Sequence, residues 1–154
     1  MVMNVIGEIL PLDHIVLDLP VSSKKRLFEQ IGLLIENKAE MARSDVFECL
    51  FAREKLGTTA LGQGVAIPHG RYAGLKRPIG AFIRTAEPIG FDAPDGKPVN
   101  MIFALLVPEG SNSVHLEVLS HLASRFSSKV VREQLLQAAD AQAVQTILMS
   151  EYRS

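Results

Sequence analysis

Seven consecutive apolar residues, from Met101 to Val107, constrain the fold of this chain more than any other part of its sequence. A strand with one face in solvent alternates apolar and polar residues, whereas a strand that is covered on both faces is apolar throughout. The run is far shorter than the roughly 20 residues that a membrane-spanning helix needs. It therefore predicts the central strand of a sheet that has helices on both faces.

The surrounding patterns fill in this architecture. Shorter strand-like runs occupy residues 14–19, 64–67 and 79–84, and a segment rich in Pro, Gly and Asp predicts a loop over residues 87–98. Helical spacing predicts helices over residues 24–38, 45–56, 114–126, 129–138 and 140–149. The candidate capping residues are Ser22 or Ser23, Ser44 or Asp45, the pair Ser127-Ser128, and Asp140. Because strands and helices do not alternate regularly, we expect an α/β fold with a small mixed β-sheet flanked by helices on both faces. No repeat or linker interrupts the sequence, so we expect a single domain over residues 1–154.

The segment Gly64-Val65-Ala66-Ile67-Pro68-His69-Gly70-Arg71 carries the strongest functional signal. Its apolar residues predict a buried strand, which should end near Pro68 because proline cannot donate to a ladder. His69 would then sit where the chain leaves the core. A neutral imidazole at such an edge is a nucleophile, a base or a ligand near neutral pH. The residues alone leave open that His69 is a loop histidine without a role.

Composition excludes several classes of function. The 154 residues include 16 Lys or Arg and 17 Asp or Glu, which gives a net charge of −1, and basic residues form no cluster with aromatic ones. We therefore expect no nucleic-acid partner. The N-terminus lacks the pattern of a signal peptide, and Cys49 is the only cysteine. We accordingly expect a cytoplasmic protein that is not embedded in a membrane, with Cys49 as a small packed residue.

The other histidines differ in their surroundings. His14 has no patterned partner, so we expect a structural role, and His121 lies off the apolar stripe of its helix, which predicts a solvated position. His115 shares a helix face with Leu119 and Leu122 near the start of that helix. It is either a core histidine satisfied by a backbone carbonyl or a residue that points into a functional site.

Two arginines compete as anion ligands. Arg53 lies near the end of the second predicted helix, before Gly57-Thr58-Thr59, and Arg71 follows His69 by two residues. A guanidinium offers a rigid fork for phosphate oxygens, although most arginines are solvated surface residues.

Several kinds of site lack their usual motifs. There is no HExxH or CxxC for a metal, no GxSxG elbow for a serine hydrolase, and no Walker A or GxGxxG loop for a nucleotide. We therefore expect no metal and no cofactor.

Taken together, the residues resemble a known family. Arg53-Glu54, Gly57-Thr58-Thr59 and the run from Leu61 to Gly70 are similar to the phosphorylation-site signature of the mannitol/fructose-type enzyme IIA of the bacterial phosphoenolpyruvate-dependent phosphotransferase system. The helix that opens with His115-Leu116 resembles a second element of that family. Residues 9–19, followed by Ser22-Ser23-Lys24-Lys25, resemble the nitrogen-regulatory branch.

The resemblance implies roles for three residues. His69 matches the phosphorylated histidine, with attack by Nε2, and Arg53 and His115 match the residues that hold the phosphoryl group. The implied fold is that of mannitol IIA. The implied partners are a phosphorylated HPr-like carrier (NPr) and regulatory targets such as potassium transport or sensor components, and the implied chemistry needs neither metal nor nucleotide.

Three alternatives remain at this stage. A sugar-specific IIA would pass the phosphoryl group to a IIB domain. A metal-dependent hydrolase would use His69 and His115 as ligands. A purely structural binding module would never be phosphorylated at His69.

Overall fold

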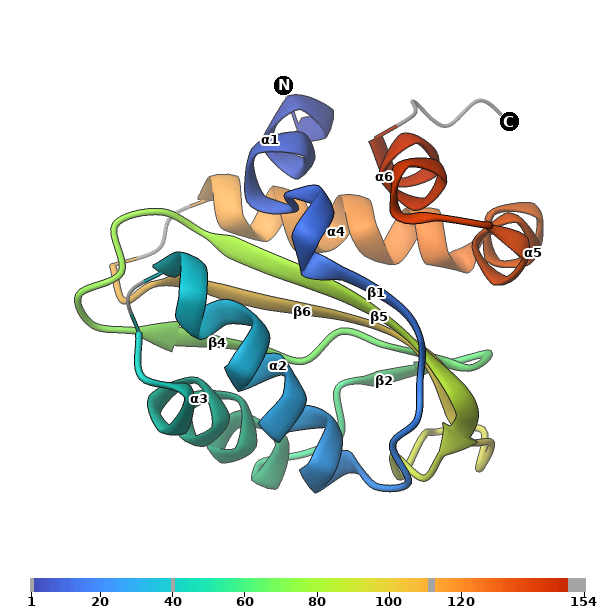
Figure 1. Ribbon diagram of the computed structural model, residues 1–154, viewed down its shortest axis with the longest axis horizontal. Helices are drawn as coiled ribbons and strands as arrows, with labels where there is room; N and C mark the ends of the chain where they lie inside the picture. The colour runs from blue at the N-terminus through green and yellow to red at the C-terminus, as the bar shows by residue number, and fades with distance from the viewer. Residues whose placement is uncertain (1, 40, 111–112, 150–154) are drawn as a thin grey trace.

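The computed structural model describes residues 2–39, 41–110 and 113–149, and only the backbone at residues 2–5, 37–39 and 113–115. Within these residues, six strands form one mixed sheet (Figure 1). The strand order is β1-β5-β6-β3-β2, and β4 also pairs with β6. The strands are β1 Ile15–Leu19, β2 Ala60–Gly62, β3 Val65–Ala66, β4 His69–Tyr72, β5 Ile79–Ile89 and β6 Val99–Pro108. The helices are α1 Val2–Ile9, the short 3-10 turn η1 Leu12–His14, α2 Lys24–Ala39, α3 Arg43–Lys55, α4 Ser113–Ser127, α5 Lys129–Gln137 and α6 Ala141–Met149.

Strand β6 lies at the centre of the sheet and is buried on both faces, as its apolar run predicts. Met101, Phe103, Leu105 and Val107 belong to one apolar cluster, and Ile102, Ala104 and Leu106 belong to another. Because successive side chains of a strand point to opposite faces, this alternation supplies both cores from one strand.

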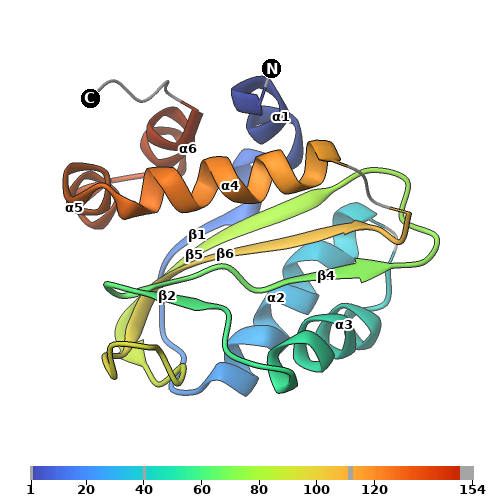
Figure 2. The same cartoon turned by 180° about the vertical axis from the view of Figure 1, so that it is seen from behind.

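Helices cover both faces of the sheet. Helices α2 and α3 pack on one face, and α1, α4, α5 and α6 lie on the other (Figures 1 and 2). The prediction of a mixed sheet with helices on both faces is therefore confirmed. No described helix is both long and apolar enough to cross a membrane.

One edge of β6 pairs with two short strands in succession. β3 runs parallel to β6 at Met101 and Ile102, and β4 runs parallel to it from Leu105 onward. Pro68 interrupts the ladder because it has no N–H, yet its carbonyl accepts a hydrogen bond from Leu105 N at 2.9 Å. The interruption at Pro68 is as predicted. The chain leaves the buried core at His69, as expected, because residues 65–68 are buried and His69 is half-buried. Strand pairing does not end there, however, since His69 begins β4.

Several element boundaries differ from the predicted ones. Strand β5 continues to Ile89, so the loop begins later than expected, and α3 begins at Arg43 without a side-chain cap from Ser44 or Asp45. Helix α1 and the short strands β2 and β4 are not among the predicted elements. The capping predictions hold at three other helices, where Ser23, Ser128 and Asp140 accept hydrogen bonds from backbone N–H groups in the first turn.

A buried arginine joins the sheet to the last helices. The Arg84 guanidinium on β5 donates to the carbonyls of Leu135, Leu136 and Ala138 at the end of α5, at 2.8 to 3.2 Å. It also pairs with Asp18, whose side chain is 70% exposed. Since an exposed ion pair contributes little, the carbonyl contacts carry most of the stabilisation.

We predict that Arg84→Met lowers the free energy of unfolding by about 2–4 kcal/mol, because three carbonyls lose a charged donor in a buried position. Asp18→Asn should cost less than about 1 kcal/mol, since asparagine tolerates the positive φ of this residue and the lost ion pair is largely solvated. Urea denaturation of both variants measures the difference. Equal losses would show that the ion pair, and not the carbonyl contacts, carries the stabilisation.

Candidate functional site

His69 and Arg71 point to the same face of the sheet. They occupy alternate positions of β4, opposite Leu105 and Val107 of β6. Gly70 points to the other face, against α3. Strand geometry therefore brings the imidazole and one guanidinium into a shared pocket.

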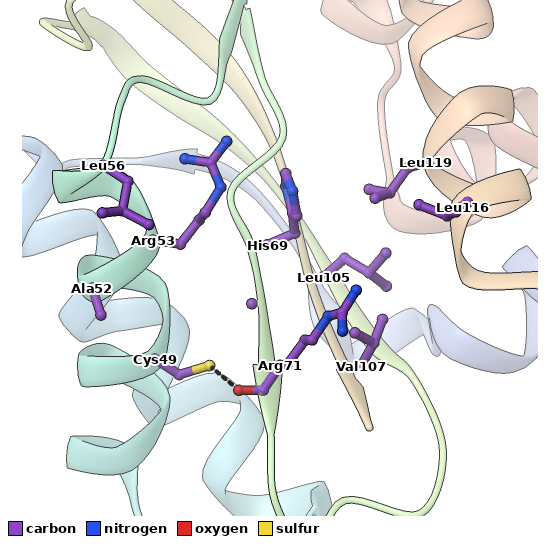
Figure 3. Close-up of a pocket in the computed structure, with 11 residues that line it drawn as sticks. Cys49, Ala52, Arg53, Leu56, His69, Arg71, Leu105, Val107, Leu116 and Leu119 are labelled. Carbon is purple, nitrogen blue, oxygen red and sulfur yellow. Dashed lines mark hydrogen bonds between the residues drawn. The ribbon is translucent and has the colours of Figure 1, made fainter. Parts of the chain in front are cut away.

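The pocket has a volume of about 380 Å³ and lies between α3, β4 and α4 (Figure 3). Such a volume is at the small end of the range for ligand pockets in proteins, roughly 300–1,000 Å³. Its walls are mainly apolar, with His69, two arginines and the Cys49 thiol as the charged or titratable groups. The lining residues are Cys49, Ala52, Arg53, Leu56, His69, Gly70, Arg71, Leu105, Val107, Leu116 and Leu119.

The imidazole of His69 is oriented by its own backbone neighbourhood. Its Nδ1 lies 2.8 Å from the carbonyl oxygen of Ile67, and the residue is half-buried. A carbonyl can only accept a hydrogen bond, so Nδ1 is the protonated nitrogen and donates. In the neutral ring, Nε2 then keeps its lone pair.

Arg53 reaches the pocket from the last turn of α3. One guanidinium nitrogen, Nη1, donates to the carbonyl of Gly57 at 2.9 Å, which holds the side chain against the loop that follows the helix. In Figure 3 the guanidinium extends from α3 toward the strand that carries His69. The structure therefore brings Arg53 into the same pocket as His69, and its other N–H groups remain available for an anion.

Arg71 lies in the same pocket and is exposed. Its guanidinium lies on the side of Leu105 and Val107, whereas Arg53 comes from α3 (Figure 3). Both candidate arginines thus border the cavity, from different elements.

The side chain of His115 lies outside the described residues. Its backbone belongs to the first turn of α4, and the next residues of that helix that line the pocket are Leu116 and Leu119. The role of His115 stays a prediction.

A close contact between α3 and β4 shapes the floor of the pocket. A Cβ added to Gly70 would lie 2.7 Å from Cys49 Sγ and 3.1 Å from Cys49 O, so only glycine fits. The Cys49 thiol donates to the carbonyl of Arg71, and burial raises its pKa above the ordinary value. Cys49 is therefore a packed thiol that holds little thiolate near neutral pH.

The remaining histidines lie apart from the pocket. His14 is buried and its Nδ1 donates to Gly80 O at 2.9 Å, which agrees with a structural role. His121 was expected in solvent, but it is half-buried, and its Nε2 has no hydrogen-bond partner among the residues that the structure describes. Within the same residues, no three His, Cys, Asp or Glu side chains lie together where a metal could bind.

Glu54 has a structural role that the sequence did not predict. Glu54 follows Arg53 in α3, is buried, and accepts hydrogen bonds from Thr59 and Lys24. The short spacing between Arg53-Glu54 and Thr58-Thr59 in the signature segment is the one local pattern that could have indicated the contact between Glu54 and Thr59. An ion pair to Lys24, 30 residues away, has no local pattern that would reveal it.

A family model covers most of the chain. The model of the family described as "Phosphoenolpyruvate-dependent sugar phosphotransferase system, EIIA 2" matches residues 8–151. The chain belongs to this EIIA family. The resemblance seen in the signature segment is thereby confirmed, and the family is a phosphotransfer component.

Individual EIIA relatives refine the comparison. A nitrogen regulatory protein of Pseudomonas aeruginosa is 41% identical over 143 residues, which cover 92% of this chain and 93% of the relative. The crystal structure of the nitrogen regulatory protein IIA-Ntr from Neisseria meningitidis is 66% identical, with a TM-score of 0.91, over 93% of this chain and 98% of that one. The chain thus most resembles the nitrogen-regulatory branch, as its N-terminal segment predicted.

A more distant EIIA structure confirms the fold. IIA mannitol from Escherichia coli superposes with a TM-score of 0.74 at 20% identity, over 90% of this chain and 97% of the other. At this identity the likeness concerns the fold alone.

We predict that Gly70→Ala destabilises this EIIA chain by about 1–3 kcal/mol, because the new methyl group overlaps the Cys49 side chain. Cys49→Ala should recover part of the loss in the double variant, since it removes the sulfur but leaves the backbone contact. A double-mutant cycle by urea denaturation measures this coupling. Strictly additive losses would show that Cys49 Sγ is not what excludes the methyl group.

Proposed function

We propose that this EIIA protein is a nitrogen-regulatory phosphocarrier that accepts a phosphoryl group on His69 Nε2 from the phosphohistidine of an HPr-like carrier. The observation that carries the proposal is the hydrogen bond from His69 Nδ1 to Ile67 O, which leaves Nε2 as the nucleophilic nitrogen beside a pocket with two arginines. A neutral imidazole needs no general base to attack phosphorus.

The transfer exchanges one N–P bond for another. The lone pair of His69 Nε2 forms a bond to phosphorus while the N–P bond to the carrier's imidazole breaks, and that bond's electron pair returns to the carrier's ring. The proton on His69 Nδ1 stays in place and keeps its hydrogen bond to Ile67. The products are phospho-His69 and the free carrier.

Positive charge assists this transfer. A loose phosphoryl-transfer transition state spreads negative charge over three oxygens, so catalysis depends on positioning and on nearby cations. Arg53, fixed by its bond to Gly57 O, faces the pocket with donors to spare. His115 completes the proposed phosphoryl-binding set, and Arg71 adds a further cation at the exposed side.

The product is a signal as well as a transfer intermediate. A phosphoryl group adds roughly −1.5 to −2 charges to a protein of net charge −1. That change favours some partners and disfavours others, and the proposed partners are the carrier and regulatory targets such as potassium transport or sensor components. In the formal sense the protein is a phosphotransferase component, although it converts no free small molecule of its own. We propose that it acts in the cytoplasm. The proposal treats residues 1–154 as one EIIA domain, since both apolar clusters pack on one sheet.

A sugar-specific IIA is the second candidate, because the family's description names a sugar phosphotransferase system. The high identity to nitrogen regulatory proteins favours the regulatory function. The two candidate functions differ in the protein to which His69 passes its phosphoryl group. Transfer of label from phospho-His69 to purified fructose-type or mannitol-type IIB proteins at rates like those of sugar IIA proteins would overturn the regulatory proposal.

We predict that His69→Ala abolishes phosphorylation by phosphoenolpyruvate, enzyme I and the HPr-like carrier, because the substitution removes the proposed acceptor nitrogen, Nε2. The label on the unaltered protein should be lost in acid and kept in alkali, as a phosphoramidate requires, and NMR should place the phosphorus on Nε2. His121→Gln serves as the control and should label normally. Labelling of the His69→Ala variant at the wild-type rate would refute the assignment.

We predict that Arg53→Ala slows phosphoryl uptake by about 10- to 100-fold with the fold retained, because a charged donor to the transferred oxygens is lost. Arg53→Lys should fall between, since an ammonium keeps the charge but not the planar fork. Lys55→Ala, in the same helical turn but outside the pocket, is the matched control. Rapid-quench labelling measures the rate and circular dichroism the fold. Unchanged kinetics in Arg53→Ala would remove this residue from the site.

A further inference from the structure

The carboxylate of Glu54 is held by several donors in the protein interior. Its side chain is 3% exposed, and Lys24 Nζ lies 2.9 Å from Oε2. Thr59 contributes both its hydroxyl, 2.6 Å from Oε1, and its backbone N–H, 3.2 Å from Oε2. Lys24 also lies over the ring of Phe91, 4.7 Å from the centroid, which fixes the ammonium in place.

This position is unfavourable for an anion by itself. Glu54 occupies the last turn of α3, where the helix dipole is negative, and burial removes the carboxylate from water. A buried charge of this kind persists only when its partners satisfy it, and removal of one partner of such a pair is strongly destabilising. The network therefore ties Glu54, Lys24 and Thr59 into one rigid unit.

The rigid unit extends to the imidazole of His69 through two backbone hydrogen bonds. The carbonyl of Thr59 accepts from Ile67 N at 3.0 Å, just beyond the β2–β3 pairing. The carbonyl of Ile67 accepts from His69 Nδ1 at 2.8 Å. The N–H and the C=O of Ile67 belong to different peptide groups, so the link is one of position: the anchored Thr59 carbonyl holds the backbone of Ile67, and with it the carbonyl that accepts from His69.

We propose that Glu54 is a positioning residue that, through Thr59 and Ile67, keeps His69 in the tautomer with the proton on Nδ1 and the lone pair on Nε2. The same carboxylate orders the loop from Gly57 to Thr59, whose Gly57 carbonyl holds Arg53. One buried group thus sets the orientation of the histidine and of the nearer arginine. The consequence for transfer rests on the proposed function, whereas the tautomer is a property of the protein alone.

The test is Glu54→Gln, which keeps the size of the side chain and removes its charge. Lys24 then loses its buried anion and keeps only the exposed Asp92, 3.6 Å away, and an amide cannot accept all the donors that the carboxylate accepts. The Ile67 carbonyl is then held less firmly, which weakens the hydrogen bond that favours the Nδ1–H form of His69. Ring nitrogen shifts from ¹⁵N NMR, recorded where the ring is neutral, should therefore show a gain of the Nε2–H form. We expect phosphoryl uptake to slow on the order of 10-fold, which is the lower end of the effect seen for partners that orient metal-bound histidines.

The matched control is Glu48→Gln, which removes an exposed carboxylate from the same helix and should leave the ring signals unchanged. Thr59→Val is the second variant, should Glu54→Gln fail to fold. It deletes one donor to Glu54 while keeping the backbone bond, and it should shift the tautomer in the same direction by a smaller amount.

The outcomes separate the two proposals. A folded Glu54→Gln or Thr59→Val protein with wild-type ring signals would overturn the positioning role, whatever the labelling shows. A shifted tautomer supports the positioning role whatever the labelling shows. Label uptake by His69→Ala overturns only the assignment of His69 as the phosphoryl acceptor.

Discussion

The buried strand β6 is the constraint on which the site depends. Its side chains supply both apolar cores, and full burial of a Leu or Phe side chain contributes about 1.5–3 kcal/mol. The register of its edge partners is therefore strongly fixed, because a slip of one residue would turn every side chain to the wrong face. The bond from Leu105 N to Pro68 O carries that register across the break in the ladder. His69 lies opposite Leu105 as a result, and its ring faces the pocket.

The polar part of the site shows a division between rigid and exposed groups. Glu54, Thr59 and the backbone around Ile67 are buried and hydrogen-bonded, whereas Arg71 is exposed. Preorganised groups need no rearrangement during a reaction, which lowers its barrier. Exposed cations adapt instead to whatever anionic group arrives. Under the proposed function, the interior would define the acceptor nitrogen and the rim would accommodate the phosphoryl donor.

How far the sequence determines these features depends on the range of the interactions involved. The apolar run of β6, the helical stripes and the caps at Ser23 and Ser128 are local patterns, and each was predicted correctly. Strand β4 was missed because its partner β6 lies about 36 residues away at Leu105, and four residues with a glycine carry no strand pattern of their own. The pocket residues His69 and Arg53 came from the signature. The Lys24–Glu54 pair was missed because it joins two helices through tertiary packing.

The position of His69 at the rim of the fold limits which partners could detect its phosphorylation. Added to a net charge of −1, a phosphoryl group of roughly −1.5 to −2 brings the protein to about −2.5 to −3. At physiological ionic strength the field of an exposed charge is screened within about 8 Å. A partner that responds to the modification must therefore contact the pocket directly, because distant surfaces sense almost nothing of it. Leu56 and Leu116, both largely exposed, line the same pocket as His69 and offer an apolar contact area there. The same face would then receive the phosphoryl group and report its presence, so the donor and any target of the protein would compete for it.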